Sequence, residues 1–224
     1  MRVVTIDGPA GAGKSTVARR LADCLGWRLL DTGAMYRAVT LAALRAQIAL
    51  ENDEAFRELV EHLTVTLPDS QVLLDGEDVS GLIRSVEITR ASRYAADSPS
   101  VRKRLVAWQR SFAEAERNVI TEGRDQGTIV FPNAFRKYFL TATDEERARR
   151  RHCEFNQRGE TISLEVVLSD IQERDARDAA RKIAPLTAAA DARVVDTTGL
   201  SLDDVTSLIE QEIRQAGAMA ETPR

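Results

Sequence analysis

The chain has 224 residues, of which 43% are hydrophobic and 29% are charged, a balance typical of a soluble globular protein. Its 31 Lys and Arg residues against 35 Asp and Glu residues leave a formal charge of −4, which excludes the overall positive field of a protein that binds duplex nucleic acid nonspecifically. Two cysteines exclude a disulfide scaffold, and together with two histidines they show no spacing typical of a zinc site.

The length predicts a single large domain, 1–224, with a small insert, because domains average roughly 150 residues. The first residues run directly into a glycine-rich segment, without the apolar core of a signal peptide. The longest apolar stretch, 38–50, is interrupted by Arg45 and Gln47 and is too short to span a bilayer. We therefore expect a cytoplasmic protein that has no contact with a membrane.

The first part of the chain alternates strand and helix. Residues 3–6 form a β-branched run that indicates a buried strand, and apolar residues recur at helical spacing over 15–25 until Gly26. Residues 27–30 indicate a second strand, followed by a helix to about residue 46. This rhythm predicts a parallel βαβ sheet.

The middle of the chain breaks the rhythm. A helix is predicted near 54–63, and two short apolar runs, 64–67 and 72–74, flank a turn at 68–70. A further short segment follows. We therefore expect residues 63–84 to form a small antiparallel β insert.

The remainder returns to the α/β pattern. The predicted helices are 86–96, 99–117, 145–156, 164–183 and 202–215, and the predicted strands are 118–121, 136–140 and 193–195. Together with the earlier elements they predict an α/β fold of three layers, with a five-stranded parallel sheet between helices.

Residues 8–15, Gly-Pro-Ala-Gly-Ala-Gly-Lys-Ser, match the phosphate-loop pattern GxxxxGK[ST] between a strand and a helix. Such a loop turns backbone N–H groups toward phosphate oxygens, and this identifies a P-loop NTPase-type fold. Lys14 is expected to bridge the β- and γ-phosphates, and the Ser15 hydroxyl to bind Mg²⁺. The predicted ATP-binding residues are Gly8, Pro9, Ala10, Gly11, Ala12, Gly13, Lys14, Ser15 and Thr16.

Two polar segments follow predicted strands, where open α/β sheets bind ligands. Tyr36 and Arg37 lie in the first turns of the helix after the second strand, and Arg124 and Asp125 follow the strand 118–121. Glu122 occupies the place where many P-loop proteins keep an acidic group near the metal. Both segments also have an alternative interpretation without a ligand. Arg37 would then be a surface arginine and Tyr36 a core tyrosine, and residues 123–125 would form a turn with a local ion pair.

Arginines also recur on two predicted helices. Arg174, Asp178 and Arg181 are spaced i, i+4, i+7 and are expected on one helix face, and Arg147, Arg150 and Arg151 share a face of the preceding helix. Such runs are commonly solvated faces. Phosphoryl transfer between two nucleotides, however, requires several arginines to neutralise two polyphosphates.

These motifs together resemble the bacterial cytidylate kinases, a branch of the nucleoside monophosphate kinase family of P-loop kinases. The matching segments are 7–15, 31–37, 76–80, 123–128, 130–132 and 173–185. The resemblance implies transfer of the γ-phosphoryl group of ATP to CMP or dCMP, with Mg²⁺, in pyrimidine nucleotide metabolism. It also implies a monophosphate-binding insert region at 63–102 and a mobile helical lid at 147–175.

The resemblance assigns roles residue by residue. The implied catalytic residues are Lys14, Arg124, Arg150 and Arg174. The implied CMP-binding residues are Thr32, Tyr36, Arg37, Ser92, Arg102, Arg124, Asp125, Asp178 and Arg181. The implied partners are ATP and CMP or dCMP, with no nucleic acid and no membrane, and the protein is expected to be a monomer.

Two other functions stay open at this point. A shikimate or dephospho-coenzyme A kinase would share the loop and the sheet but would not need the insert or the Arg/Asp set. A nucleotide-dependent switch would hydrolyse ATP slowly without an acceptor. A guanine-specific switch is disfavoured because no asparagine begins the pattern Asn-Lys-x-Asp.

Overall fold

The computed structural model describes residues 1–68, 71–157 and 159–221. Two residues of the predicted hairpin turn, 69 and 70, and residue 158 of the predicted lid lie outside the described residues. The chain divides into two compact units. The smaller comprises Leu30–Arg117 with Met1, and the larger comprises Arg2–Leu29 and Asn118–Arg224.

The central sheet has the predicted five strands. They are β1 (Arg2–Asp7), β2 (Arg28–Asp31), β6 (Asn118–Glu122), β7 (Arg136–Thr141) and β8 (Arg193–Asp196), in the order β2-β6-β1-β7-β8. β1 pairs in parallel with β6 and β7, and β7 pairs in parallel with β8. The predicted α/β fold is confirmed.

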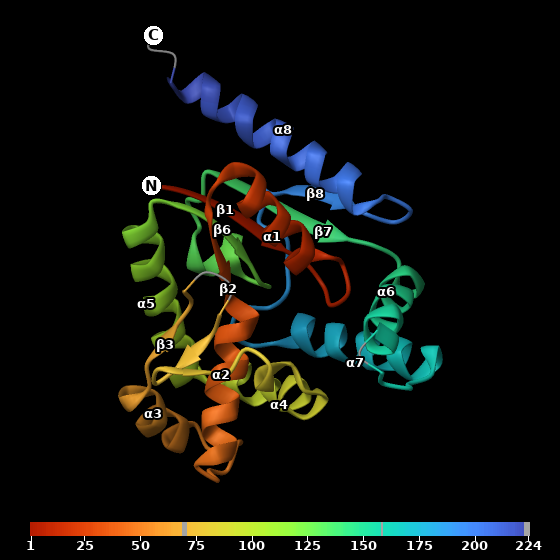
Figure 1. Cartoon of the computed structure of the whole chain (residues 1–224). Helices are drawn as coiled ribbons and strands as arrows, with labels where there is room; N and C mark the ends of the chain where they lie inside the picture. The colour runs from red at the N-terminus through yellow and green to blue at the C-terminus, as the bar shows by residue number, and fades with distance from the viewer. Residues whose placement is uncertain (69–70, 158, 222–224) are drawn as a thin grey trace. The chain divides into compact units, whose positions relative to one another are not determined.

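Helices α1 (Lys14–Leu25) and α8 (Leu202–Glu221) pack against each other in the larger unit (Figure 1). Their apolar faces join the buried residues of β1, β6 and β7 in one hydrophobic core, which includes Leu21 and Ile209. Gly26 ends α1 with a φ of 65°, as the sequence predicts. The last helix continues to Glu221, beyond the predicted end at residue 215.

Helices α6 (Asp144–Gln157) and α7 (Leu164–Ala180) lie side by side (Figure 1) and enclose a small core of their own. The side chain of Ser163 caps α7 by accepting from the N–H of Val166. The predicted helix to residue 183 is too long. Arg181 already has an extended ψ of 133°, and the chain turns at Ala184, which precedes a proline and has a φ of 53°.

The smaller unit is mostly helical. It contains α2 (Thr32–Arg45), α3 (Asp53–His62), the 3₁₀ turn Leu82–Arg84, α4 (Val86–Asp97) and α5 (Pro99–Glu116). Caps that are readable in the sequence begin these helices. The Asp31 carboxylate accepts from the Ala34 N–H at 2.8 Å, and Ser98 caps α5 just before Pro99.

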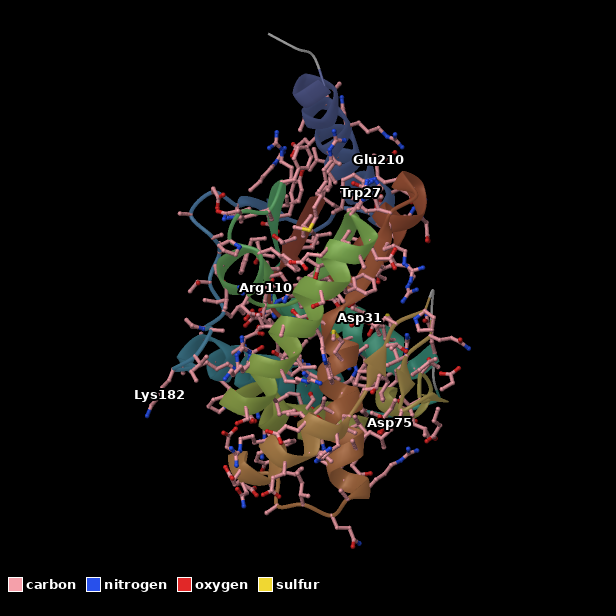
Figure 2. The ribbon with its side chains drawn as sticks, turned by 90° about the vertical axis from the view of Figure 1, so that its left-hand side faces the viewer. Trp27, Asp31, Asp75, Arg110, Lys182 and Glu210 are labelled. Atoms are coloured by element: carbon pink, nitrogen blue, oxygen red, sulfur yellow. The ribbon has the colours of Figure 1, made fainter. Side chains whose placement is uncertain are left out.

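The predicted antiparallel insert is present in the smaller unit. Its strands β3 (Val65–Thr66), β4 (Leu73–Leu74) and β5 (Glu77–Asp78) form a sheet in that order. Asp75, labelled in Figure 2, lies in the turn between β4 and β5 with a φ of 50°. Its carboxylate accepts from the Thr64 N–H at 2.7 Å, so the side chain of the turn also fixes the start of the hairpin.

Candidate functional site

The phosphate loop leaves β1 in a conformation that requires glycine at two positions. Gly8 has a φ of 144°, and a Cβ there would lie 2.0 Å from the carbonyl oxygen of Leu140. Gly11 has a φ of 75°, and a Cβ there would lie 2.9 Å from the carbonyl oxygen of Arg147. The loop is therefore packed tightly between β7 and α6, and α1 begins immediately after it.

Lys14 is almost fully buried at the start of α1. Its Nζ donates to the carbonyl oxygen of Pro9 at 2.7 Å. Burial, together with the nearby charges of Arg124 and Arg174, lowers the pKa of Lys14 to about 7, although Glu122 acts in the opposite direction. The ammonium group thus lies in an electropositive environment, and a bound anion would stabilise its charged form.

Two side chains whose oxygens could bind a metal ion, Ser15 and Glu122, meet beside the loop. The Ser15 hydroxyl donates to the Glu122 Oε1 at 2.9 Å, and Glu122 is buried at the carboxyl end of β6. Oxygen ligands suit Mg²⁺, which usually binds one or two protein groups together with waters and substrate phosphates. Among the described residues, no group of three or more His, Cys, Asp or Glu side chains is placed to hold a metal by itself.

A π-helical turn, Gln126–Val130, follows the segment Gly123–Asp125, and the sequence did not predict it. Asp7 fixes this turn, since its carboxylate accepts from the N–H groups of Gln126 and Gly127 at 2.9 and 2.7 Å. Burial and the neighbouring Asp125 raise the pKa of Asp7 to about 6, against the effect of these two bonds. π-helical turns are frequent at functional sites.

Asp178 lies between two guanidinium groups. Arg124 Nε donates to its Oδ2 at 3.0 Å, and Arg181 Nη2 lies 2.7 Å from its Oδ1. Burial raises the pKa of this carboxyl, but Arg124, Arg181 and Arg174 outweigh it, so the net pKa lies below the usual range. Asp178 is therefore an ionised, acceptor-only group in a nearly solvent-free position.

The expectation that Arg174, Asp178 and Arg181 share a helix face is wrong for Arg181. This residue lies beyond the last helical residue, Ala180, and has an extended backbone. Its side chain nevertheless returns to Asp178, because the buried carboxylate is a strong electrostatic partner. Arg181 is thus paired with Asp178 from outside the helix, and the charges of both Arg174 and Arg181 lower the pKa of that carboxyl.

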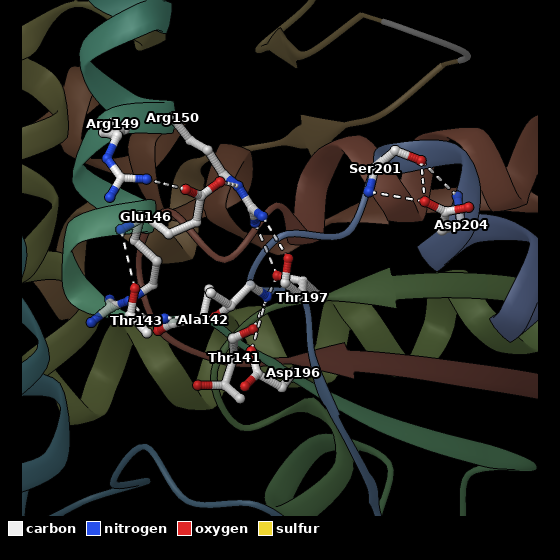
Figure 3. A network of polar contacts seen from close by, with 12 residues as sticks. Thr141, Ala142, Thr143, Glu146, Arg149, Arg150, Asp196, Thr197, Ser201 and Asp204 are labelled. Atoms are coloured by element: carbon white, nitrogen blue, oxygen red, sulfur yellow. Dashed lines mark hydrogen bonds and ion pairs between the residues drawn. The ribbon is translucent and has the colours of Figure 1, made fainter.

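Arg150 reaches from α6 toward the segment after β8, as Figure 3 shows. Its Nη1 and Nη2 donate to the hydroxyl and the carbonyl oxygen of Thr197 at 2.9 and 2.7 Å, and its Nε donates to Glu146. A Cβ on Gly13 would lie 3.8 Å from Arg150 Nη1, so this guanidinium borders the phosphate loop. No pattern in the sequence marks Thr197 as the partner of Arg150.

Five of the predicted CMP-binding residues lie in the smaller unit. Thr32 begins α2, where Tyr36 and Arg37 follow, Ser92 lies in α4, and Arg102 lies in α5. α2 and α5 both pack against α4. Thr32, Ser92 and Arg102 are buried.

Arg37 is incompletely paired within the smaller unit. One of its terminal nitrogens, Nη2, lies 3.8 Å from Asp31 Oδ2, and among the described residues its buried Nε has no hydrogen-bond partner. A buried guanidinium N–H without an acceptor is uncommon and suits a group that binds an anion.

The sequence model of the cytidylate kinases matches residues 4–215. The chain belongs to the cytidylate kinase family. Among curated relatives, the cytidylate kinase of Shewanella amazonensis is 49% identical over 209 residues, covering 91% of this chain and 90% of that protein. The cytidylate kinase of Salmonella arizonae is 46% identical over 222 residues, covering 97% of both.

A solved structure shows a similar fold. It is that of an uncharacterized protein from Eubacterium ventriosum, with a TM-score of 0.54, 14% sequence identity and coverage of 96% of this chain and 98% of that one. The match of the family model confirms the resemblance to the cytidylate kinase family over nearly the whole chain.

In the part of the chain that the structure describes, no helix has the length and apolar character needed to cross a membrane.

Proposed function

We propose that this cytidylate kinase family member transfers the γ-phosphoryl group of ATP to CMP or dCMP, giving ADP and CDP or dCDP. The carrying observation is that a complete phosphate loop and a buried, ionised Asp178 held by two arginines occur in one unit of a chain that matches the cytidylate kinase family over residues 4–215. This places the protein in pyrimidine nucleotide metabolism.

The donor side is assigned to residues 8–16, which bind the phosphates of ATP. Backbone N–H groups of the loop and the start of α1 face the phosphate oxygens. Lys14 leaves the carbonyl oxygen of Pro9 and bridges the β- and γ-phosphates. The low pKa that burial and two nearby arginines impose on Lys14 supports this assignment, because a bound polyphosphate supplies the missing negative charge.

Mg²⁺ is the proposed cofactor, and the donor set beside the loop fits it. Ser15 would hold the ion with the ATP phosphates, and Glu122 would lie next to that site through its bond to the Ser15 hydroxyl. The ion would supply neutralisation of charge on the transferring phosphoryl group.

The acceptor phosphate is assigned to Tyr36 and Arg37 on α2, the helix that Thr32 begins, and to Arg102 on α5 of the same smaller unit. The buried Nε of Arg37, which has no hydrogen-bond partner among the described residues, supports anion binding at this position. The insert region 63–102 is proposed to enlarge this monophosphate-binding part of the single kinase domain 1–224.

The cytosine is assigned to Asp178, with Ser92, Arg102, Arg124 and Arg181 as further contacts. Cytosine presents an exocyclic amino group, a donor that suits a carboxylate, whereas uracil presents an acceptor at the same position. The ionised state of Asp178 therefore favours CMP over UMP. Asp125 and Asp178 are also proposed to hold the sugar hydroxyls.

The reaction needs no general base, because the oxygen of the acceptor phosphate is already an anion. Catalysis comes from in-line positioning of the two phosphates and from neutralisation of their charge by Lys14, Arg124, Arg150 and Arg174. The helical region 147–175 is proposed to be the lid that covers the transferring group.

We further propose that the protein acts as a cytoplasmic monomer whose partners are small nucleotides rather than nucleic acid or membrane. The net charge of −4 argues against a general affinity for polyanions. Size-exclusion chromatography with light scattering tests the oligomeric state directly.

The decisive experiment is an acceptor screen with ATP and Mg²⁺, in which ADP formation is measured with CMP, dCMP, UMP, AMP and shikimate. The proposal predicts rapid turnover with CMP or dCMP, slower turnover with UMP, and little ADP without an acceptor. Turnover with shikimate would support a different small-molecule kinase. ATP hydrolysis that does not respond to any acceptor would support a nucleotide-dependent switch.

A further inference from the structure

Arg147 is a buried arginine of α6 that the assigned chemistry does not use. Its Nη1 donates to the carbonyl oxygen of Ala10 in the phosphate loop at 2.8 Å, and its Nε donates to the carbonyl oxygen of Ala142 at 3.1 Å. The same guanidinium forms ion pairs with Asp144 and Asp175. A side chain with this many buried contacts is fixed in position rather than solvated.

Asp175 on α7 contacts Ala10 as well, through the N–H group rather than the carbonyl oxygen. One carboxylate oxygen, Oδ1, accepts from the N–H of Ala10 at 3.2 Å, and the other, Oδ2, pairs with Arg147. The peptide groups on both sides of Ala10 are therefore held by one ion pair between two helices. Gln172, one turn earlier on α7, donates to Asp144 at 3.0 Å and ties the helices together again.

The contacts fix the loop at a critical point. Ala10 immediately precedes Gly11, where the packing of the loop against α6 leaves no room for a Cβ. Because Arg147 draws the Ala10 carbonyl oxygen to itself, that oxygen is directed at a cation instead of at the phosphates. Carbonyl oxygens facing a phosphate would repel it, so the outward orientation favours an inward-facing set of N–H groups.

The same two residues stand at the two ends of the proposed lid region, 147–175. Arg150 lies one helical turn beyond Arg147, and Arg174 directly precedes Asp175. Both of these arginines are assigned to charge neutralisation during transfer. A contact that fixes Arg147 and Asp175 on the loop thus also fixes the base of the segment that carries Arg150 and Arg174.

We propose that Arg147 and Asp175 are positioning residues that clamp the peptide groups on both sides of Ala10, holding the phosphate loop in its ATP-binding conformation and anchoring on it the base of the segment that carries the lid arginines. Neither side chain touches the substrates in this proposal. The expected effects on kcat rest on the proposed function. The expected effect on ATP affinity does not, because it requires only that the phosphate loop binds ATP.

The principal variant is Asp175→Asn, which keeps the size and one acceptor of the side chain but removes the ion pair with Arg147. Its matched control is Asp170→Asn, the same chemical change at an exposed position of the same helix. A second pair is Arg147→Lys with the control Arg149→Lys, since Arg149 is 62% exposed and pairs with Glu146 on the surface of α6.

Three measurements are made on each full-length variant: the Tm, the Kd for ATP without acceptor, and kcat and KM for CMP. The clamp predicts that Asp175→Asn and Arg147→Lys weaken ATP binding about tenfold or more and lower kcat by a similar factor, because a buried charge-assisted contact is lost. The KM for CMP stays within about twofold, and both controls behave like the wild type.

Further outcomes separate the clamp from other roles. The effects of Asp175→Asn and Arg147→Lys should be strongly non-additive in the double variant, since they break one contact. A lower Tm with unchanged Kd and kcat would show a merely structural ion pair and would overturn the proposal, as would tighter ATP binding in Asp175→Asn. A wild type that binds ATP but does not phosphorylate CMP would refute the proposed function and leave the ATP-binding comparison decisive for the clamp.

Discussion

Arg124 Nε donates to Asp178 Oδ2 at 3.0 Å, which joins the segment after β6 to the last turn of α7 across 54 residues of sequence. The carboxylate is nearly inaccessible to solvent, and Arg181 pairs with its other oxygen. A buried carboxylate with two cationic partners is held in one ionisation state and one orientation. A group fixed in this way can discriminate between bases.

The first prediction concerns this discrimination. Asp178→Asn replaces an acceptor-only carboxylate with an amide that also donates, so it should lower kcat/KM for CMP about tenfold or more and reduce the preference for CMP over UMP by a similar factor. The measurement is kcat/KM for the two acceptors under identical ATP and Mg²⁺. Asp170→Asn serves as the control. A variant with weaker activity but an unchanged CMP to UMP ratio would show that Asp178 does not contact the base.

The second prediction concerns Lys14. Lys14→Met should reduce kcat by about 10³-fold, since the variant lacks the cation that neutralises the transferring phosphoryl group. Burial makes the ionised ammonium unfavourable in the free protein, so the variant should unfold at a Tm equal to or above that of the wild type. Steady-state kinetics and thermal denaturation at pH 7 test both parts. Turnover near the wild-type value would refute the role assigned to the loop.

Local patterns in the sequence predicted most of the fold. The β-branched run before Gly8, the helical spacing after Lys14 and the stop at Gly26 each depend on neighbours within a few residues. The sequence also predicted that the hairpin insert would interrupt the α/β rhythm, and the small sheet of the smaller unit confirms it.

The parts that could not be predicted depend on distant residues. The π-helical turn after Asp125 is fixed by Asp7, about 120 residues earlier, and no local pattern marks it. Arg181 was expected on the helix face because the periodicity continues, whereas α7 ends at Ala180 and the ψ of 133° at Arg181 has already left the helical range. The pairing of Arg147 with Ala10 and Asp175 likewise exists only in the folded chain. The binding roles of the site residues stay predictions.

The third prediction is that ATP binding takes up protons above pH 7. The pKa of Lys14 is about 7 in the free protein, so at pH 8 most of the molecules hold it neutral. Bound polyphosphate raises that pKa again, and the protein should therefore take up close to one proton per ATP at pH 8.

Calorimetric titration of ATP at pH 8 in two buffers of different ionisation enthalpy measures this proton uptake. At this pH the ATP phosphates contribute little because their own last pKa lies near 6 to 7. Lys14→Met should abolish the difference between buffers. Equal apparent enthalpies for the wild type in both buffers would show that Lys14 is already charged before ATP binds.

The fourth prediction concerns the dependence of stability on pH at Asp7. Burial and the charge of Asp125 raise the pKa of this carboxyl from 3.8 to about 6 in the folded protein, so the folded state holds the proton more tightly than the unfolded state does. The stabilisation that this group provides is complete below pH 3.8 and is lost as the pH rises through 6. The shift corresponds to about 3 kcal/mol of unfolding free energy.

Asp7→Asn isolates this contribution, because the variant cannot titrate at that position. The difference in unfolding free energy between wild type and variant, measured by urea denaturation from pH 4 to pH 7, should change by about 2 kcal/mol, the greater part of the full shift, with the wild type losing stability relative to the variant as the pH rises. The amide offers a single acceptor for the N–H groups of Gln126 and Gly127, so the KM for CMP should also rise through a less rigid Arg124–Asp125 segment. A difference in stability that is constant with pH would show that Asp7 is ionised throughout and that its two backbone bonds outweigh its burial.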